Sequence, residues 1–322
     1  MSSGLPAPTV SGLVSHWSVQ PMAIVAITAL VAWYWYAVRS YRAAGNPWPS
    51  SRVVLFGFGV VLTVWATCGF PEAYARSLFW IWTSQQLGLL LILPAMLLGG
   101  GPLELARLRG GPTGRVQRFV DSGPIRALGN PLIGPALIPL ASVILFFGPL
   151  PGWAISERPV GWVLPLFVLA AGSLVVLRLI GLQSTPTSLA VGLALAIGSF
   201  ELVLDAVPGI ALRLHRSTST TFFDHRLAHV WAQSPVHDQQ LAGSILWCVA
   251  ELVDLPFLLL VFRQWIRADA RDAAQVDAVL EAERIAHASP DRPAGGAPDE
   301  PSRDLPWWVG DPSMQNRLKR QG

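Results

Sequence analysis

The sequence is poor in charge. Only 13% of its 322 residues are Asp, Glu, Lys or Arg, whereas 52% are hydrophobic. A soluble domain carries about 25% charged residues. The sequence also has only two cysteines, Cys68 and Cys248, both in or beside apolar segments, which does not indicate a disulfide framework. This composition excludes an ordinary soluble domain and predicts a polytopic membrane protein.

Enzyme motifs are also lacking. The sequence shows no nucleophile–base pair, no glycine-rich phosphate loop and no haem-attachment motif. Serine, histidine and aspartate all occur, but their spacing does not single out a catalytic triad. We therefore expect a protein that is not an enzyme and that does not bind nucleic acid.

Seven apolar segments are long enough to be membrane spans, because a hydrocarbon core about 30 Å thick needs about 20 helical residues. The amino terminus, MSSGLPAPTVSGLVSHW, has no basic region and no small-residue cleavage site, so the first segment is expected to be a retained span rather than a signal peptide. We predict an all-α, seven-helix membrane bundle with spans at residues 19–38, 53–70, 78–98, 132–150, 160–180, 187–207 and 241–262.

The basic residues predict the orientation of these spans. Eighteen of the 23 Lys and Arg residues follow the first, third, fifth or seventh span, and five lie on the other side. Because loops rich in Lys and Arg stay in the cytoplasm, we expect residues 1–18 and a long loop at 208–240 to lie outside. The transmembrane domain would be 19–263, with 264–322 as a cytoplasmic tail, in a multi-pass protein of the bacterial plasma membrane.

The tail has two parts by composition. It begins with a polar, helix-forming stretch, RQWIRADARDAAQVDAVLEAERIAH, and continues with ASPDRPAGGAPDEPSRD, which has the composition of a disordered linker. Trp307 and Trp308 then lie near basic residues. They could dock on the inner membrane face or on a partner; the alternative is a tail that is mostly disordered.

Acidic residues occur inside the last two predicted spans. They are Glu201 and Asp205 in the sixth span and Glu251 and Asp254 in the seventh. No lysine or arginine lies at that depth, so these carboxyls must be protonated or bound to a cation, an amide or a histidine. An ionisable residue at membrane depth is a functional hypothesis by default, and a structural hydrogen-bond network is the alternative.

Two adjacent amides, Gln85 and Gln86, lie in the third predicted span. An amide in hydrocarbon is costly unless it is hydrogen-bonded. An isolated carboxyl that faces lipid is costly as well. We therefore expect Glu251 to face the bundle interior within reach of Gln86, Glu201 or Gln240. The predicted interhelical polar network consists of Gln85, Gln86, Glu201, Asp238, Gln239, Gln240 and Glu251.

Five of the six histidines fall on the predicted outer side. His225 and His229 are four residues apart, so a short helix over residues 222–231 would place both imidazoles on one face. His237 follows close by. These are suitable ligands for copper or zinc, although two histidines at this spacing in an outer loop are commonly only solvated.

One block after the outer loop, DQQLAGSILWCVAELVDLPFLLLVFRQWIRADARDAAQVD, resembles the last span of the CtaG-like cytochrome c oxidase assembly family. The segments HWSVQPMAIVAITALVAWYWYAVRSYRAAGNPWP and SLFWIWTSQQLGLLLILPAMLLGGGPLELA are similar to its first and third spans, and the resemblance covers roughly residues 15–277. The residues that match the last-span pattern are Asp238, Gln239, Gln240, Gly243, Trp247, Glu251, Leu252 and Trp265.

The resemblance implies a seven-span membrane protein that supplies copper to the oxygen-reducing centre of a haem–copper oxidase. Members of the family carry histidines in the third, fifth and sixth spans. Here those positions are occupied by Trp82, Gln86, Pro165, Phe167 and Ser188. An amide is a poor copper ligand, so this chain keeps the scaffold of the family and departs from its metal-binding pattern.

We therefore predict an integral membrane factor for cytochrome c oxidase assembly, with the lipid bilayer and oxidase subunits as partners. Copper, if handled, would be held on the outer side by His225, His229 and His237, with Cys248 and Met96 as softer ligands in the bundle. One alternative is a metal-free scaffold or interaction protein. Another is a proton-linked small-solute transporter that uses Glu201 and Glu251.

The predicted topology can be tested with reporter fusions. A reporter fused after Arg267 should be active in the cytoplasm, and one inserted in the 208–240 loop should be active outside, because the basic residues hold the carboxyl terminus inside. A periplasmic signal from the Arg267 fusion would contradict this orientation.

Overall fold

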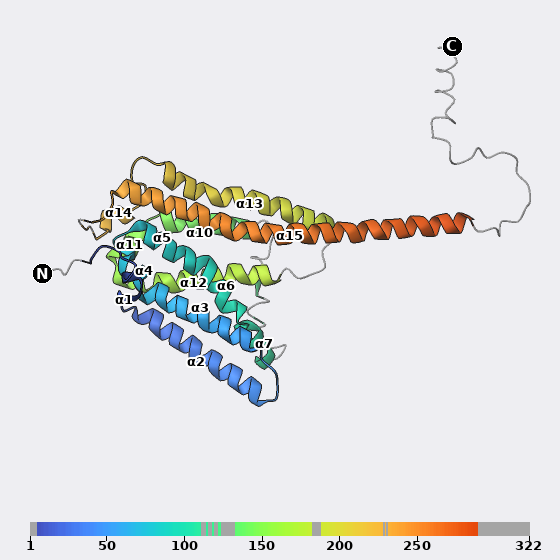
Figure 1. Cartoon of the computed structure of the whole chain (residues 1–322), viewed down its shortest axis with the longest axis horizontal. Coiled ribbons are helices and arrows are strands. Elements are labelled where there is room, and N and C mark those ends of the chain that lie inside the picture. Colours follow the sequence, from blue (N-terminus) through green and yellow to red (C-terminus); the bar gives the residue numbers. More distant parts are fainter. Residues whose placement is uncertain are drawn as a thin grey trace, which may run out of the picture. The chain divides into compact units, whose positions relative to one another are not determined.

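The chain folds into helices. The computed structural model describes residues 5–110, 114, 118, 122–123, 133–181, 188–227, 229 and 231–288, and within these ranges it contains no strand, which confirms the all-α prediction. The chain divides into two units, Met1–Asp272 and Ala273–Gly322, and the first holds the helix bundle (Figure 1). The helices are α1 (Gly12–Ser15), α2 (Pro21–Ala43), α3 (Ser50–Cys68), α4 (Phe70–Ala75), α5 (Phe79–Leu87), the π-helix η1 (Gly88–Ile92), α6 (Leu93–Gly99), α7 (Pro102–Gly110), α10 (Ile133–Phe147), α11 (Leu150–Ser156), α12 (Arg158–Gly181), α13 (Ser188–Leu214), α14 (Phe222–His225) and α15 (Pro235–Ala288).

Four helical segments of the described chain are long and apolar enough to cross a membrane. They are Pro21–Ala43, Ser50–Ala75, Phe79–Gly99 and Arg158–Leu177, and the bent pair Pro139–Phe147 and Leu150–Ser156 would make a fifth. These five correspond to the first five predicted spans. Helices α13 and α15 cover the other two, and the count of seven and the orientation stay predictions.

The helices that flank the predicted outer loop are longer than the sequence indicates. Helix α13 continues through Pro208 to Leu214, and α15 begins at Pro235. Proline usually ends a helix, but membrane helices tolerate it where neighbouring groups satisfy the freed carbonyl. The segment between the two helices is therefore 215–234, shorter than the predicted loop at 208–240. Trp307 and Trp308 lie outside the described residues.

The second span is broken near its end at Gly69. Helix α3 stops at Cys68 and α4 starts at Phe70 with a proline in its first turn. At Gly69 the backbone leaves the helical conformation, with φ −94° and ψ −151°, and a Cβ there would lie 2.6 Å from the carbonyl oxygen of Trp65. Only glycine fits this break, which brings the first turn of α4 against the end of α3.

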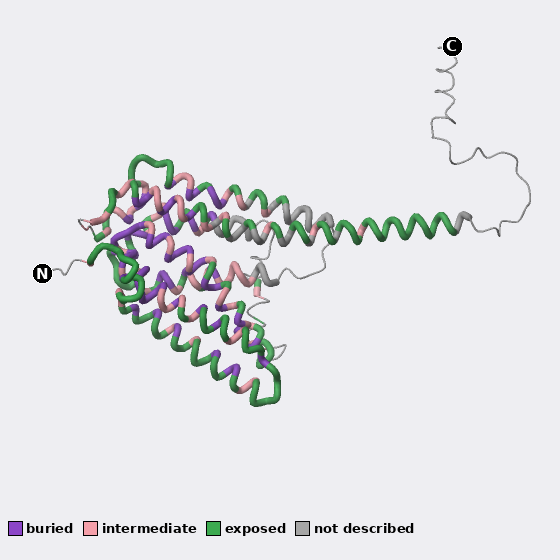
Figure 2. Tube along the Cα trace, viewed as in Figure 1, coloured by how far each residue is buried: buried purple, intermediate pink, exposed green. Residues whose placement is uncertain are grey.

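The third span, α5–η1–α6, is the centre of the bundle. Of its most apolar stretch 67% is buried, against 44%, 28% and 22% for the other three candidate spans, and α5 lies among the most deeply buried elements in Figure 2. Its ring side chains pack closely with two distant elements. Trp82 meets Phe146 of α10 at 5.6 Å between ring centroids, and Phe79 meets Phe222 of α14 at 4.9 Å.

Helices α13 and α15 touch through glycine. A Cβ at Gly243 of α15 would lie 2.6 Å from the amide nitrogen of Arg213 and 2.6 Å from the carbonyl oxygen of Gly209, both on α13. Small residues let membrane helices approach closely enough for their backbones to pack. The glycine of the Asp-Gln-Gln block is therefore explained by a helix contact.

Replacing Gly243 with alanine should weaken this contact. The added methyl group meets backbone atoms that cannot move aside, so we expect Gly243→Ala to destabilise the protein by about 1–3 kcal/mol, measured as a lower melting temperature in detergent. Gly57→Ala is the matched control, because a Cβ at Gly57 meets nothing within 4 Å. Equal melting temperatures for the two variants would argue against the close contact.

Candidate functional site

A carboxylate and three amides meet where α3 breaks into α4. Gln20 Nε2 donates a hydrogen bond to Glu72 Oε1 at 2.5 Å, and Gln85 Nε2 donates to Glu72 Oε2 at 2.8 Å. Gln86 Nε2 donates in turn to Gln85 Oε1 at 3.4 Å. The three amide side chains are buried, and Glu72 is half-buried. We call Gln20, Glu72, Gln85 and Gln86 the amide–carboxylate cluster.

The end of α3 also belongs to this region. The last carbonyls of a helix have no hydrogen-bond donor within it, and here other elements supply the donors. The carbonyl oxygen of Ala66 accepts a hydrogen bond from Gln85 Nε2 at 2.8 Å, and that of Cys68 accepts one from the amide nitrogen of Ser18 at 2.7 Å. Gln85 thus ties the central helix α5 to both α3 and α4.

This arrangement explains the two adjacent glutamines of the third span. Gln85 uses its amide nitrogen on two acceptors and its oxygen on Gln86. Gln20 and Glu72 are partners that the sequence does not predict, because both lie at the ends of apolar segments, where polar residues are ordinary. The one available signal was that two buried amides require partners from neighbouring span ends.

Asp238 lies at the start of α5, although it belongs to α15. Its Oδ2 accepts a hydrogen bond from the amide nitrogen of Phe79 at 2.9 Å, and its Oδ1 accepts one from Trp80 at 3.0 Å. The N-cap residue of α5 is Leu78, whose side chain cannot accept a hydrogen bond. Asp238 therefore caps α5 from 159 residues away, and its negative charge suits the amino end of a helix.

The environment of Asp238 is otherwise closed. Its side chain is fully buried, and Arg226 Nη1 approaches Oδ2 at 3.8 Å. Burial raises the pKa of the Asp238 carboxyl, while the amide groups of Phe79 and Trp80 and the nearby Arg226 and His237 act against this rise. The donors hold the carboxyl in one position, which fixes the start of α15 against the start of α5.

The side chain of Gln239 on α15 forms hydrogen bonds with the end of α13 and the segment that follows it. Its Oε1 accepts hydrogen bonds from the amide nitrogen and the hydroxyl of Ser219 at 2.8 and 3.2 Å. Its Nε2 donates to the carbonyl oxygens of Leu212 and Ser217 at 3.3 and 3.1 Å. Gln240 beside it is only half-buried. Asp238 thus satisfies the start of α5, and Gln239 satisfies a carbonyl near the end of α13.

The structure describes two of the four predicted intramembrane carboxyls, Asp205 and Glu251. Glu251 is half-buried, and its Oε1 accepts a hydrogen bond from Trp247 Nε1, one turn earlier on α15, at 3.2 Å. Asp205 is buried on α13. The side chains of Glu201 and Asp254 lie outside the described residues. In the described chain, Gln85 is hydrogen-bonded to Gln86, and Glu251 is hydrogen-bonded to Trp247. The expected interior role of Glu251 stays a prediction.

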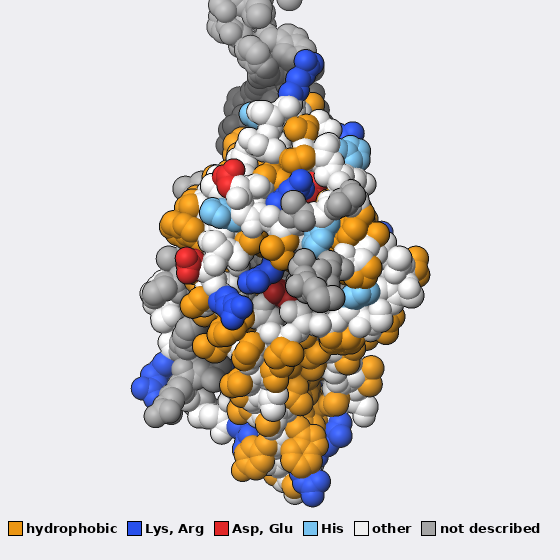
Figure 3. Space-filling model, turned by 90° about the vertical axis from the view of Figure 1, so that its left-hand side faces the viewer, with side chains coloured by type: hydrophobic (Ala, Val, Ile, Leu, Met, Phe, Trp, Pro, Cys, Tyr) orange, Lys and Arg blue, Asp and Glu red, His pale blue; other side chains and the backbone are white. Residues whose placement is uncertain are grey.

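The structure also separates the histidines of the outer loop. Helix α14 ends at His225 and Arg226 is extended, with ψ 149°, so the expected helix over 222–231 is not formed and one face does not carry both imidazoles. His229 stacks on Trp231 with ring centroids 4.8 Å apart, and His237 is exposed at the start of α15. Figure 3, which faces the end of the first unit that carries α4, α11 and α14, shows imidazoles as separate patches.

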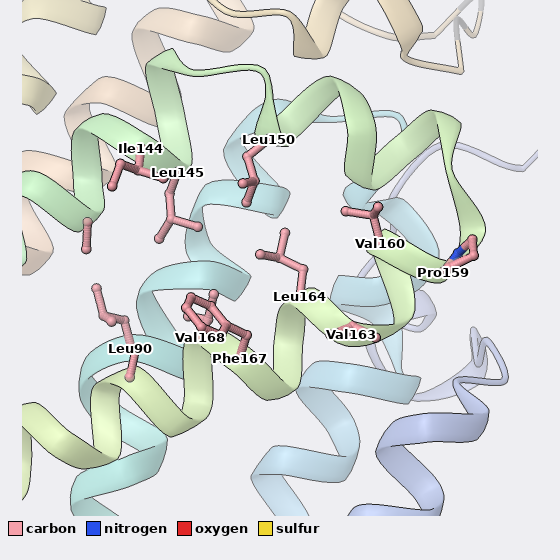
Figure 4. Close-up of a pocket in the computed structure, with 12 residues that line it drawn as sticks. Leu90, Ile144, Leu145, Leu150, Pro159, Val160, Val163, Leu164, Phe167 and Val168 are labelled. Atoms are coloured by element: carbon pink, nitrogen blue, oxygen red, sulfur yellow. The ribbon is translucent and has the colours of Figure 1, made fainter.

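An apolar cavity of about 510 Å³ lies between α12 and the bent pair α10–α11. Its wall includes Leu90 of η1, Leu145 of α10, Leu150 of α11 and Phe167 of α12, as Figure 4 shows. Phe167 is one of the positions where the resemblance would place a histidine. Because the lining is apolar, the cavity offers no ligand to a metal.

The described polar groups near Gln86 are amides and a carboxylate. Copper prefers imidazole, thiolate and thioether ligands, whereas Trp82 and Gln86 occupy the third-span positions. Cys248 is exposed on α15 and Met96 is half-buried on α6, a different helix. Within the described ranges no group of three or more His, Cys, Asp and Glu side chains is placed to hold a metal ion.

Removing the long-range cap should destabilise the bundle. Asp238→Ala would leave two buried amide groups at the start of α5 unsatisfied, at a cost of about 1–3 kcal/mol. Asp238→Asn should cost less, because its carbonyl can still accept one of the two hydrogen bonds. Thermal unfolding in detergent measures both, with Asp269→Ala on the exposed part of α15 as the control. A melting temperature of Asp238→Ala equal to the control would rule out the capping role.

Three mycobacterial proteins are similar to this chain. An uncharacterized protein of Mycobacterium bovis is 26% identical over 284 residues, 84% of this chain and 42% of that protein, and one of Mycobacterium tuberculosis matches equally. An uncharacterized protein of Mycobacterium leprae is 26% identical over 270 residues, 79% of this chain and 40% of that protein. The chain thus spans about two fifths of the length of the curated relatives it matches.

No solved structure matches the chain. The profile of the family described as cytochrome c oxidase caa3 assembly factor (Caa3_CtaG) matches residues 32–268. The match includes the central third span, the cap residue Asp238 and the glycine contact of α15. The chain belongs to the caa3-type cytochrome c oxidase assembly factor family.

Proposed function

We propose that this chain is a multi-pass protein of the bacterial plasma membrane that crosses the bilayer seven times and assists the assembly of cytochrome c oxidase. The observation that carries the proposal is the family match over residues 32–268, which contains the core of the bundle. An assembly factor works by binding, so the chain would act on oxidase subunits without catalysing a reaction of its own.

The surface of the helices supports a membrane location. Large apolar side chains are exposed along the outside of the spans, among them Val25 of α2, Val61 of α3 and Phe167 of α12. Exposed apolar surface on this scale marks a membrane or protein contact. Arg39 stacks over Trp35 at 5.5 Å, on the predicted inner side, which is typical of a residue pair at the headgroup level.

We further propose that the chain works without a copper ion in the bundle centre. Of the two third-span positions where the resemblance places histidines, Trp82 is packed among aromatic rings, and Gln86 donates a hydrogen bond to Gln85, whose amide nitrogen donates to Ala66 and Glu72. Both positions thus support the packing of the bundle. Copper handling by the exposed outer histidines is the second candidate, favoured by the gathering of five histidines on the predicted outer side.

One complementation experiment separates the two candidates. A host that lacks this protein should assemble less cytochrome c oxidase, and the wild-type chain should restore it. A triple variant, His225→Ala with His229→Ala and His237→Ala, should restore it equally and should carry the same copper content when purified. Copper content by mass spectrometry and oxidase content by haem spectra are the readouts.

The controls make this result interpretable. Asp238→Ala, which removes a structural cap, should restore less oxidase and shows that the assay responds to damage in this chain. If the triple variant loses both copper and oxidase while its melting temperature is unchanged, the copper candidate replaces the metal-free one. If deletion leaves oxidase content unchanged, the proposed role in assembly is wrong.

A further inference from the structure

We propose that the amide–carboxylate cluster is a binding site for a small, hard, monovalent cation, for which we take Na⁺. The site is formed by the Glu72 carboxylate, the side-chain amides of Gln20 and Gln85, and the carbonyl oxygen of Ala66, and Gln86 supports it through its hydrogen bond with Gln85. It is separate from the histidines considered for copper, and it does not depend on the role in oxidase assembly.

The negative charge of Glu72 favours a bound cation. Glu72 is hydrogen-bonded only to neutral amides, and the ion pairs of the described residues do not include it. Arg76, one turn further on, acts on it through space without a salt bridge. The end of α3 adds the negative pole of a helix, about half a charge. A site with this much negative potential and no bonded positive group attracts a cation.

The cluster also contains buried oxygen atoms that have no hydrogen-bond partner. Gln20 is 3% exposed and Gln86 is 2% exposed, and the Oε1 atom of each is buried without a hydrogen bond. Thr83, one turn before Gln86 on α5, has an unpartnered hydroxyl as well. Buried polar atoms are almost always satisfied. The unpartnered oxygens of Gln20, whose amide nitrogen is hydrogen-bonded to Glu72, and of Gln86, whose amide nitrogen is hydrogen-bonded to Gln85, indicate that a group with several bonding positions belongs in the cluster.

The arrangement of the amides fits this requirement. The Nε2 atom of Gln85 lies 2.8 Å from both Ala66 O and Glu72 Oε2, so two oxygens from two elements converge on the place that it occupies. Rotation of an amide about its last torsion exchanges nitrogen for oxygen, and the two ends are chemically able to serve either as donor or as acceptor. With the Gln20 and Gln85 amides rotated, both present oxygen beside the Glu72 carboxylate, and Gln86 turns its own oxygen to accept a hydrogen bond from the rotated Gln85 amide.

The donor set selects the kind of ion. Oxygen ligands suit hard cations and not copper. A single carboxylate balances one positive charge, which favours a monovalent ion over calcium or magnesium. Broken membrane helices commonly bind Na⁺ through the carbonyl end of a half-helix, and the break at Gly69 provides such an end. A proton on Glu72 would neutralise the charge but would satisfy only one of the unpartnered oxygens.

Purified full-length protein in detergent tests the proposal. Thermal unfolding is followed while NaCl replaces choline chloride at constant ionic strength and pH, with KCl as a separate series. Since a ligand stabilises the state that binds it, Na⁺ should raise the melting temperature saturably, on the order of 3 °C, and choline should not. Binding of radioactive ²²Na⁺ to the same preparation measures the site directly.

Two variants and one control decide the assignment. Glu72→Gln should abolish the Na⁺-dependent shift and ²²Na⁺ binding, and Gln86→Met, which keeps the length of the side chain but lacks the oxygen, should weaken binding about tenfold, or about 1.4 kcal/mol. Glu104→Gln removes an exposed carboxyl that pairs with Arg52 and should leave the shift intact.

Each outcome bears on the proposal. An equal response of wild type to Na⁺ and choline overturns it, and so does a Na⁺ shift that survives in Glu72→Gln. If Glu72→Gln does not fold, the Gln86→Met affinity decides, and an unchanged value overturns the site. If acidification raises the melting temperature and Na⁺ does not, the occupant is a proton and the cation proposal fails. Loss of Na⁺ binding with oxidase assembly intact would leave the proposed function standing.

Discussion

The carboxylate of Asp238 on the first amide groups of α5 is the interaction on which the bundle depends. Helix α5 begins the most buried of the four candidate spans in the described chain, and its N-cap position holds a leucine. In a low-dielectric interior an unsatisfied amide costs free energy that packing must offset. The cap comes from the start of α15, so satisfying α5 also fixes where α15 begins.

The neighbouring residues of the block follow from that position. Once Asp238 is placed, Gln239 reaches the end of α13 and the segment after it, with all of its hydrogen-bonding groups engaged. One turn later Gly243 meets the backbone of α13. The Asp-Gln-Gln-x-x-Gly pattern therefore encodes a helix cap, hydrogen bonds to the loop and a helix contact within two turns of α15. This gives a physical reason for its occurrence in a scaffold whose metal-site histidines are replaced.

The need for hydrogen-bond partners at a buried helix end also explains the amide–carboxylate cluster. The break at Gly69 leaves carbonyl groups of α3 without partners inside the helix, and Gln85 takes one of them while holding Glu72. The neighbouring position that carries a histidine in the family is filled by Trp82, which packs on Phe146. Aromatic packing and amide hydrogen bonds thus stabilise the bundle centre, and the proposed cation would replace the amide donors of Gln20 and Gln85 on the Glu72 carboxylate.

The sequence by itself determined the helical class, the apolar spans and the family, because these depend on composition, on the length of apolar runs and on short motifs. It also located Gln85, Gln86, Asp238 and Gln239 as polar residues that need partners. The tertiary structure alone decided which partners they have, because the hydrogen bonds of Asp238 and Glu72 join residues that are 159 and 52 positions apart. It also decided that His225 and His229 do not share a helix face, since α14 ends at His225. Spacing along a chain predicts a shared face only where the helix continues, and its end is set by packing against other elements.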